Sequence, residues 1–412
     1  MKFIRTVSTG RLLASIVGLA VAIAAGTAIA VAASGTGPVP GNQPLASAAH
    51  KALAAPAVTG ITADISFTNH LIDSSAFTGQ NVDPILQGAT GRLWLSNDHR
   101  LRLELQSDNG DAQVVVNKRS FWASDPASHT VYEGTLPADK AGAKDKTTAG
   151  QAVPTMNQLQ RDLNKLRKRV NVSGAIPSDV AGQSAYTVSV SPKHDGGLLG
   201  QAQLAWDAIK GVPLRVAVYA KNNATPVLEL KATNISYGTV PASDFNVTPP
   251  AGSKVVKVSS AGKSPTDAKA AKIAKAAKRG ARAHHQITGV AAVAQRLPFK
   301  LVAPRKLVGL PRQSVQLMDW GGKPAALVSY GQNLGGIAVL EQTAPAGKAA
   351  NPASGGGVGS GLSLPTVSIR GATGQELDTA LGTMVRFTRG GVAYTVIGSV
   401  PSTAADAAAR GL

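Results

Sequence analysis

The sequence predicts an α+β protein with two domains, in which a curved antiparallel sheet with one apolar face and covering helices precedes a smaller α+β domain. Residues Arg100–Leu105 alternate strictly, which places three leucines on one face of a strand and charged side chains on the other. Apolar residues then recur with the helical period over Met156–Val170. A run rich in lysine and alanine, 254–285, holds too few apolar residues for a core and separates the two domains.

A meander of short strands is predicted around the alternating strand. Asn109-Gly110 supplies the two positive φ angles of a type I′ turn, so this strand folds back onto Gln113–Asn117. Turns at 118–120 and 125–128 then separate short strands around 121–122 and 130–132. The result is four or five antiparallel strands in a curved sheet.

These residues resemble a known family. The stretch 91–137, which reads GRLWLSNDHRLRLELQSDNGDAQVVVNKRSFWASDPASHTVYEGTLP, is similar to the core of the LolA-type lipoprotein-carrier proteins and of their relative RseB, a periplasmic sigma-factor regulator. The resemblance resumes at 211–254. It implies a bent antiparallel sheet, an incompletely closed barrel, with helices lying across its concave apolar face. The resemblance rests on strands and turns and includes no catalytic motif.

Length and composition limit the kinds of site that the chain can build. Its 412 residues are enough for two domains, each with its own core. Cysteine is absent, so disulfides, thiolate metal sites, cysteine nucleophiles and lipid-bearing cysteines are excluded. The formal net charge of +19 favours an anionic partner.

The first 35 residues are predicted to be a targeting segment. Lys2, Arg5 and Arg11 precede 12–33, an uncharged run that would span roughly 33 Å as a helix. Basic residues on the N-terminal side predict that the rest of the chain is exported. The segment is either a single-pass membrane anchor of an extracytoplasmic protein, or a signal peptide whose cleavage leaves a secreted or periplasmic one.

Residues 36–253 are predicted to form the LolA-like domain. A short helix over 44–54 precedes a first strand over 59–67, and 71–88 is a loop that either connects strands or acts as a lid. The amphipathic helix 156–170 either packs its apolar stripe on the sheet or moves aside for an acyl chain. Further strands are predicted at 186–190, 201–206, 214–218 and 228–232, and Pro249-Pro250 closes the domain.

Much of the excess positive charge lies between the domains. The stretch 254–282 holds nine basic residues and the single acid Asp267. It is predicted to be a solvated, semi-rigid linker, or a segment attracted to an anionic membrane surface. Nucleic acid is not expected as a partner, because the chain is exported and no aromatic residues are interleaved here to stack on bases.

Residues 286–412 are predicted to form the smaller α+β domain. Helices are expected at 287–295 and 401–409, with strands around 314–318, 325–330, 336–341, 366–369, 384–387 and 393–397. A large LolA-like domain followed by a smaller one is similar to RseB in outline.

No catalytic, metal or cofactor site is predicted. The seven histidines form no HxxxH or HExxH pair, a GxSxG elbow is absent, and the glycine-rich run 355–361 is not followed by Lys-Ser/Thr. The chain is therefore expected not to be an enzyme and to need no cofactor.

The leading hypothesis is a membrane-tethered extracytoplasmic binding protein, a carrier or sensor whose apolar concave sheet holds lipid or the acyl chains of a lipoprotein. Its groove residues are predicted to be the inward-facing alternates Leu93, Leu95, Leu101, Leu103, Leu105, Tyr186, Val188, Val190, Val216, Val218, Leu228 and Leu230. Each of them could equally be plain core. One alternative is an RseB-like regulator that binds an anti-sigma factor or another envelope protein through its C-terminal domain. The other is an envelope scaffold without a ligand.

Overall fold

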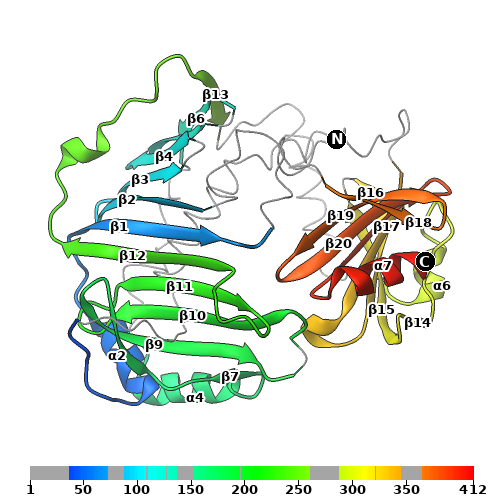
Figure 1. The fold of residues 1–412 in the computed structure, drawn as a ribbon, viewed down its shortest axis with the longest axis horizontal. Helices are drawn as coiled ribbons and strands as arrows, with labels where there is room; N and C mark the ends of the chain where they lie inside the picture. Colours follow the sequence, from blue (N-terminus) through cyan, green and yellow to red (C-terminus); the bar gives the residue numbers. More distant parts are fainter. Residues whose placement is uncertain are drawn as a thin grey trace, which may run out of the picture.

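A computed structural model describes residues 37–72, 88–107, 110–126, 128–136, 153–194, 196–259, 287–320, 322–344 and 364–412. They form a sheet of 13 strands that curls as a half-barrel, and beside it a sheet of 8 strands (Figure 1). The predicted α+β class with a curved antiparallel sheet is confirmed. The targeting segment 1–35, most of the loop 71–88 and most of the linker 254–285 lie outside the described residues. No helix among the described residues combines the length and apolar character needed to cross a membrane.

The large sheet has the strand order β13-β6-β5-β4-β3-β2-β1-β12-β11-β10-β9-β7, with β8 paired to β9. Its strands are β1 (Gly60–Asn69), β2 (Gly88–Ser96), β3 (Arg100–Ser107), β4 (Gly110–Asn117), β5 (Ser120–Asp125), β6 (Thr130–Thr135), β7 (Val170–Val172), β8 (Ile176–Val180), β9 (Gln183–Pro192), β10 (Leu199–Asp207), β11 (Pro213–Ala220), β12 (Leu228–Tyr237) and β13 (Lys254–Ser259).

The first strand holds the large sheet together. β1 pairs with β2 on one side and with β12 on the other, so it joins the meander β2–β6 to the meander β9–β12. The predicted reversals at 118–120 and 125–128 are present, whereas 108–109 of the predicted type I′ turn lie outside the described residues. His99, Lys118 and His129 adopt positive φ at three of the reversals, and Ser107 pairs with Gly110 across the predicted type I′ turn.

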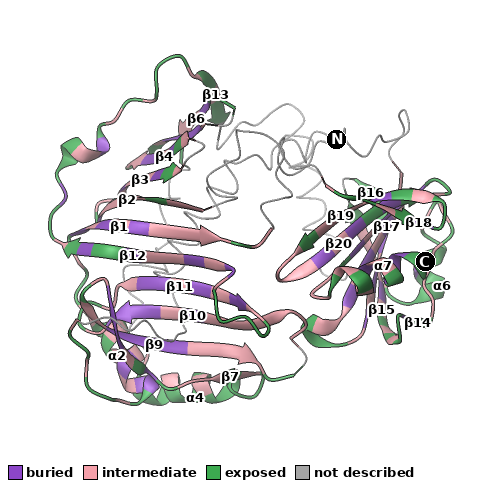
Figure 2. Cartoon of the chain, viewed as in Figure 1, coloured by how far each residue is buried: buried purple, intermediate pink, exposed green. Residues whose placement is uncertain are grey.

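Two helices lie at the β9 end of the large sheet, α2 (Leu45–Ala54) and α4 (Met156–Leu166) (Figure 1). The predicted helix was too long, because Arg167 caps α4 and Val170 begins β7. No residue of α4 is fully buried, and Figure 2 shows the helix coloured as intermediate and exposed. Leu163 packs partly against the core, while Met156 is exposed. The main apolar core of the large sheet, which includes residues of β1, β3–β5 and β8–β12, contains no residue of α2 or α4 among the described residues. These helices therefore cover one end of the apolar face.

The chain leaves β12 through the 3-10 helix η3 (Ala242–Phe245) and returns to the far edge of the sheet. Residues 254–259 were predicted to begin the linker. They instead form β13, which pairs in parallel with β6 from Lys254 opposite Thr130 onward. Val255, Val256 and Val258 have β-branched side chains, which suit a strand better than a solvated helix.

The small sheet has the order β14-β15-β16-β17-β21-β20-β19-β18. Its elements are α6 (Val290–Ala294), β14 (Lys306–Leu307), β15 (Leu310–Trp320), β16 (Lys323–Tyr330), η4 (Asn333–Gly335), β17 (Ile337–Thr343), β18 (Thr366–Ile369), β19 (Ala372–Thr379), β20 (Gly382–Arg389), β21 (Val392–Gly398) and α7 (Ser402–Arg410). One face packs against α6 and α7 in a core that includes Val293, Val339 and Ala408. The predicted strands and both helices are present, and β14 and β19 were missed.

Within the part of the chain that the structure describes, two backbone hydrogen bonds join the sheets. The N–H of Leu198 donates to the carbonyl oxygen of Ser399 at 3.0 Å, and the N–H of Ala380 donates to the carbonyl oxygen of Leu71 at 2.9 Å. Leu71 follows β1 and Leu198 precedes β10, so both contacts lie at the same end of the large sheet. We call these contacts the junction.

Candidate functional site

The twelve predicted groove residues lie on one face of the large sheet. Strand register proves this, because residues directly opposite each other in neighbouring strands share a face. Leu93 pairs with Leu103 and Leu95 with Leu101. In the other half Val216 pairs with Leu230 and Val218 with Leu228, and Val188 and Val190 pair with Leu204 and Ala202 of β10. We call this side of the sheet the apolar face.

β1 makes the apolar face continuous between its two halves. Ile61 lies opposite Leu95 of β2 and Tyr237 of β12, and Phe67 lies opposite Leu230. A bulge between Asp64 and Ile65 shifts the register in between, yet apolar residues remain paired on both sides of it. The apolar face therefore extends without a break from β5 to β9.

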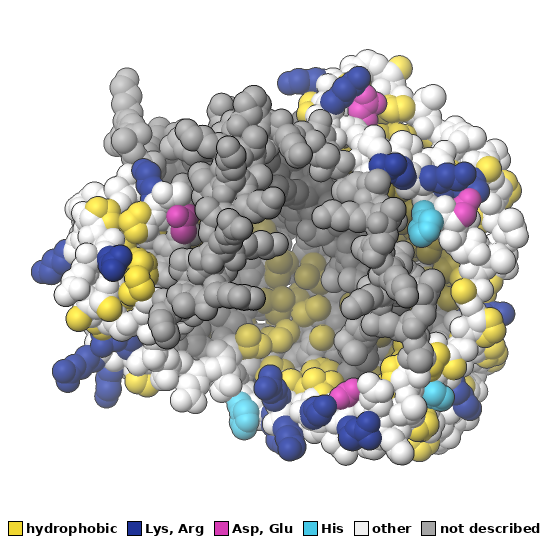
Figure 3. All heavy atoms as spheres, turned by 180° about the vertical axis from the view of Figure 1, so that it is seen from behind, with side chains coloured by type: hydrophobic (Ala, Val, Ile, Leu, Met, Phe, Trp, Pro, Cys, Tyr) yellow, Lys and Arg dark blue, Asp and Glu magenta, His cyan; other side chains and the backbone are white. Residues whose placement is uncertain are grey.

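Burial divides the apolar face into two parts. Leu101, Leu103 and Leu105 are buried, with 8, 8 and 4% of their surface exposed. Val216, Val218, Leu228 and Leu230, together with Leu93, Leu95 and Val190, are only half-buried. The middle of β3 is therefore core, and the half-buried part, mainly over β11 and β12, is the better candidate for a ligand surface. Hydrophobic side chains also form the visible floor of the hollow in the middle of the molecule in Figure 3.

At the β9 end the apolar face is closed by helix α2. Tyr186 and Val188 are buried, and Tyr186 lies with its ring centroid 6.2 Å from that of Trp206. Leu45 and Ala48 of α2 belong to the same cluster. The Tyr186 hydroxyl also donates to the carbonyl oxygen of Gly41 at 2.6 Å. These two predicted groove residues are therefore core under α2.

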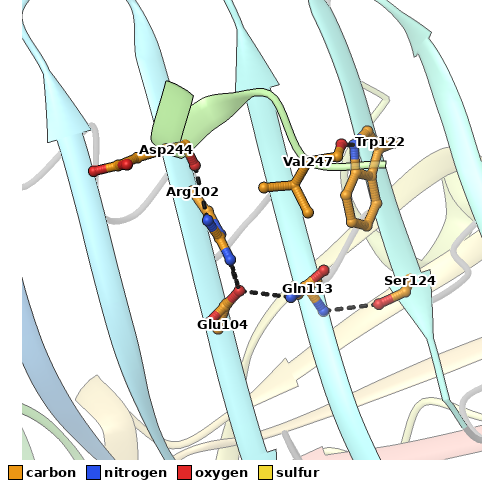
Figure 4. Close-up of polar contacts among 7 residues, drawn as sticks. All are labelled: Arg102, Glu104, Gln113, Trp122, Ser124, Asp244 and Val247. Atoms are coloured by element: carbon orange, nitrogen blue, oxygen red, sulfur yellow. Dashed lines mark hydrogen bonds and ion pairs between the residues drawn. The ribbon is translucent and has the colours of Figure 1, made fainter. Parts of the chain in front are cut away.

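The opposite face of the large sheet is polar and partly covered. Over β3–β5 the segment that contains η3 crosses it, as Figure 4 shows: Arg102 Nη1 donates to the carbonyl oxygen of Asp244 at 2.9 Å, and Trp122 Nε1 donates to that of Val247 at 3.1 Å. The side-chain amide of Gln113 donates to Glu104 at 2.6 Å. Ligands are thus less easily placed on this side of β3–β5.

A buried polar network lies on the polar face of β10–β12. Arg215 Nε donates to Glu229 Oε1 at 2.7 Å, and its two terminal nitrogens donate to Gln203 and Tyr219, each at 2.7 Å. The Tyr219 hydroxyl donates to Gln203 Oε1 at 2.8 Å. All four side chains are buried, with 8% exposure at most. Because the members satisfy one another, the network orients the three strands that carry the half-buried part of the apolar face.

Two cavities lie on the polar face. One of about 350 Å³ is bordered by Asp64, Arg92 and Glu104, and one of about 220 Å³ lies between Trp122 and Phe245. None of the predicted groove residues lines either cavity. Among the described residues, no group of three or more histidine or acidic side chains is placed to hold a metal ion. The expectation that the chain is not an enzyme stays a prediction.

One buried titratable residue was not predicted from the sequence. Glu341 of β17 is fully buried in the core of the small sheet, and burial raises the pKa of its carboxyl group to about 7. Its burial could have been predicted from the sequence pattern. Residues Ile337, Val339 and Glu341 occupy alternate positions of one strand and therefore point to the same, buried side.

No family model and no curated protein matches the chain. Among solved structures, MucB in complex with MucA(peri) is 15% identical, with a likeness that covers 89% of this chain and 94% of that chain at a TM-score of 0.36. The LolA superfamily protein NE2245 from Nitrosomonas europaea is 9% identical and covers 50% of this chain and 99% of its own, with a TM-score of 0.19. A putative outer membrane lipoprotein-sorting protein domain from Vibrio parahaemolyticus is 11% identical and covers 49% of this chain and 95% of its own, also with a TM-score of 0.19.

Proposed function

We propose that the protein is an extracytoplasmic binding protein whose apolar face takes up the acyl chains of a lipid or a lipoprotein, as a carrier or a sensor. The observation that supports this is the half-buried apolar surface over β11 and β12, formed by Val216, Val218, Leu228 and Leu230. An antiparallel sheet that simply faced solvent would carry polar side chains there.

In the proposed mechanism the protein binds the acyl chain by burying apolar surface and catalyses no reaction. Burying apolar surface contributes about 0.8 kcal/mol per methylene group, so a few acyl carbons on this surface are enough for useful binding. The network of Arg215, Glu229, Gln203 and Tyr219 on the reverse side holds the strands in place while the apolar side is empty or filled.

The proposed site of action is the outer side of a membrane. The predicted targeting segment 1–35 would export or anchor the chain, and the basic stretch 254–282 would be attracted to anionic headgroups by roughly 1 kcal/mol per basic residue near the surface. An anionic lipid is therefore the first ligand to test.

The experiment is native mass spectrometry with lipid extraction on the full chain, purified from membranes and then offered phosphatidylglycerol. We expect bound lipid in the wild type and reduced uptake in Leu228→Asn and Val218→Asn, at two half-buried positions of the apolar face. Ile176→Asn is the matched control, because this exposed residue lies opposite Thr187 on the polar face.

A wild-type chain that carries no lipid and takes up none would overturn this function. That result would favour the regulator hypothesis, in which residues 286–412 bind an envelope protein such as an anti-sigma factor. Retention of a membrane regulator by the full chain, and its loss on deletion of those residues, would support that alternative.

A further inference from the structure

The small sheet carries a row of apolar side chains on its outward face, beside polar residues such as Gln316, Ser329 and Thr395. Its core face packs against α6 and α7, so the other face should be polar if it only met solvent. Instead strand register sets Ala338 beside Ile397, Ile397 beside Met384, and Met384 beside Leu377. Leu327 and Leu340 form a second pair next to this row. We call these six residues the outer strip.

The outer strip is accessible. Ile397 is 52% exposed, and the other five residues are half-buried. A row of this kind across β17, β21, β20 and β19 costs solubility unless something covers it.

The outer strip lies immediately beside the junction. Ala380, whose N–H donates to Leu71, stands in the turn between Leu377 and Met384. Ser399, whose carbonyl oxygen accepts from Leu198, follows Ile397 by two residues. One end of the outer strip is thus tied by hydrogen bonds to the large sheet.

The large sheet presents its half-buried apolar residues at the same place. Leu71 follows the end of β1, where Asn69 pairs with Leu228, and Leu198 precedes β10, where Ala202 pairs with Val218 and Val190. Figure 1 places the small sheet beside this end of the large one, and Figure 3 shows hydrophobic side chains in the hollow between the two. The junction therefore lies at one end of each of the two apolar surfaces.

We propose that the outer strip is the second wall of the acyl-chain site, so that a bound chain contacts both sheets. This rests on the proposed function and extends it: the large sheet alone would hold a short chain, and the outer strip adds contact for the carbons beyond it. Each further methylene buried there raises affinity by about fourfold. The site then selects for long acyl chains.

The test compares a short-chain and a long-chain phosphatidylglycerol bound to the full chain. We expect Ile397→Asn and Met384→Gln to weaken binding of the long-chain lipid by about tenfold, because a polar group replaces apolar contact, and to leave short-chain binding unchanged. Leu334→Asn is the matched control, since Leu334 is 51% exposed in η4 and lies off the strip. A phosphatidylglycerol with a photoreactive group at the end of its long acyl chain should label peptides from 372–398 as well as from the large sheet.

Three results would overturn the proposal. If the wild type and the strip variants bind the long-chain lipid equally well and labelling is confined to the large sheet, the outer strip does not contact the acyl chain. The proposed function then still holds. Absence of lipid binding in the wild type removes both the second wall and the proposed function. A strip variant that changes the oligomeric state and not lipid uptake assigns the strip to contact with a second copy of the chain.

Discussion

The carboxyl group of Glu341 accepts a hydrogen bond from the backbone N–H of Val302 at 2.9 Å, and its side chain is fully buried in the small sheet. Its other oxygen, and the hydroxyl of Tyr330, have no hydrogen-bond partner among the described residues. Burial is the main cause that raises the pKa of Glu341 from its ordinary 4.5 to about 7, and the hydrogen bond from Val302 lowers it by less. Burial, followed by the charge of Glu341, raises the pKa of Tyr330 to about 12.

This arrangement predicts that the contribution of Glu341 to the stability of the small sheet is largest in acid. The folded state holds the Glu341 proton more tightly than the unfolded state, so its contribution is complete below pH 4.5 and is lost as the pH rises to about 7. Glu341→Gln keeps the shape and the acceptor for Val302 without the charge. We expect it to stabilise the small sheet at pH 8 by on the order of 3 kcal/mol and to leave it unchanged at pH 4.

Hydrogen exchange of the β17 amides in the full chain, measured across this pH range, checks the Glu341 prediction. Glu376→Gln is a control on the same sheet, because Glu376 is less buried. A pH dependence that is the same in wild type and Glu341→Gln would contradict the assignment.

Arg215 and Glu229 are expected to depend on each other. Both are buried and are joined by a hydrogen-bonded ion pair. The Nζ of Lys231 lies 3.3 Å from the second carboxylate oxygen, Oε2, of Glu229. Replacing Glu229 with leucine leaves a buried guanidinium without its carboxylate, which typically costs about 3–5 kcal/mol. The double variant Arg215→Met, Glu229→Leu should lose much less. Chemical denaturation of the wild type, the two single variants and the double variant measures the interaction free energy of Arg215 and Glu229. Additive losses of stability would show that the two residues do not depend on each other.

The two parts of the apolar face should respond differently to truncation. Leu103→Ala removes a buried side chain and should cost about 2–5 kcal/mol of the free energy of unfolding. Leu228→Ala, at a half-buried position on the same face, should cost clearly less and should weaken lipid uptake instead. Denaturant titrations beside native mass spectrometry separate the two effects. Equal destabilisation at both positions would mean that the whole face is core.

The sequence predicted the apolar face better than it predicted what covers that face. Leu93, Leu103, Val188 and Leu228 could be assigned to one side because a period of two keeps alternate residues on the same face over many strands. The burial of Val188 could not be predicted, since it depends on α2, which lies far away in the sequence.

Elements were missed where local pattern and tertiary pairing disagree. The amphipathic stripe continues to Val170, yet the chain turns into β7 there because β9 offers an edge for Val170–Val172 to pair with. Likewise Lys254–Ser259 is rich in lysine, as a linker would be, and becomes a strand because β6 is available. Long-range pairing of this kind leaves little signal in a short window of sequence.

Gly197 is expected to hold the two sheets at their present angle. It adopts a φ of 60°, and a Cβ added to it would lie 2.1 Å from the carbonyl oxygen of Ser399, which accepts the hydrogen bond from Leu198. Gly197→Ala therefore combines backbone strain with a collision at the junction. Gly182 has a similar φ of 72° and nothing within 4 Å of an added Cβ, so Gly182→Ala reproduces the strain without the collision.

Because the chain has no cysteine, Ile209→Cys in the turn between β10 and β11 and Leu334→Cys in η4 introduce two unique and exposed labelling sites, one beside each sheet. We expect single-molecule energy transfer between dyes at these sites to show one distance in the wild type and in Gly182→Ala, and a broader distribution in Gly197→Ala. The strain of either alanine should cost a similar amount of stability, about 1 kcal/mol. If Gly197→Ala keeps the wild-type distance distribution, the junction does not depend on the close approach of Gly197 to Ser399. If Gly197→Ala both broadens the distance distribution and weakens long-chain lipid binding, the proposed two-walled site depends on the angle between the sheets.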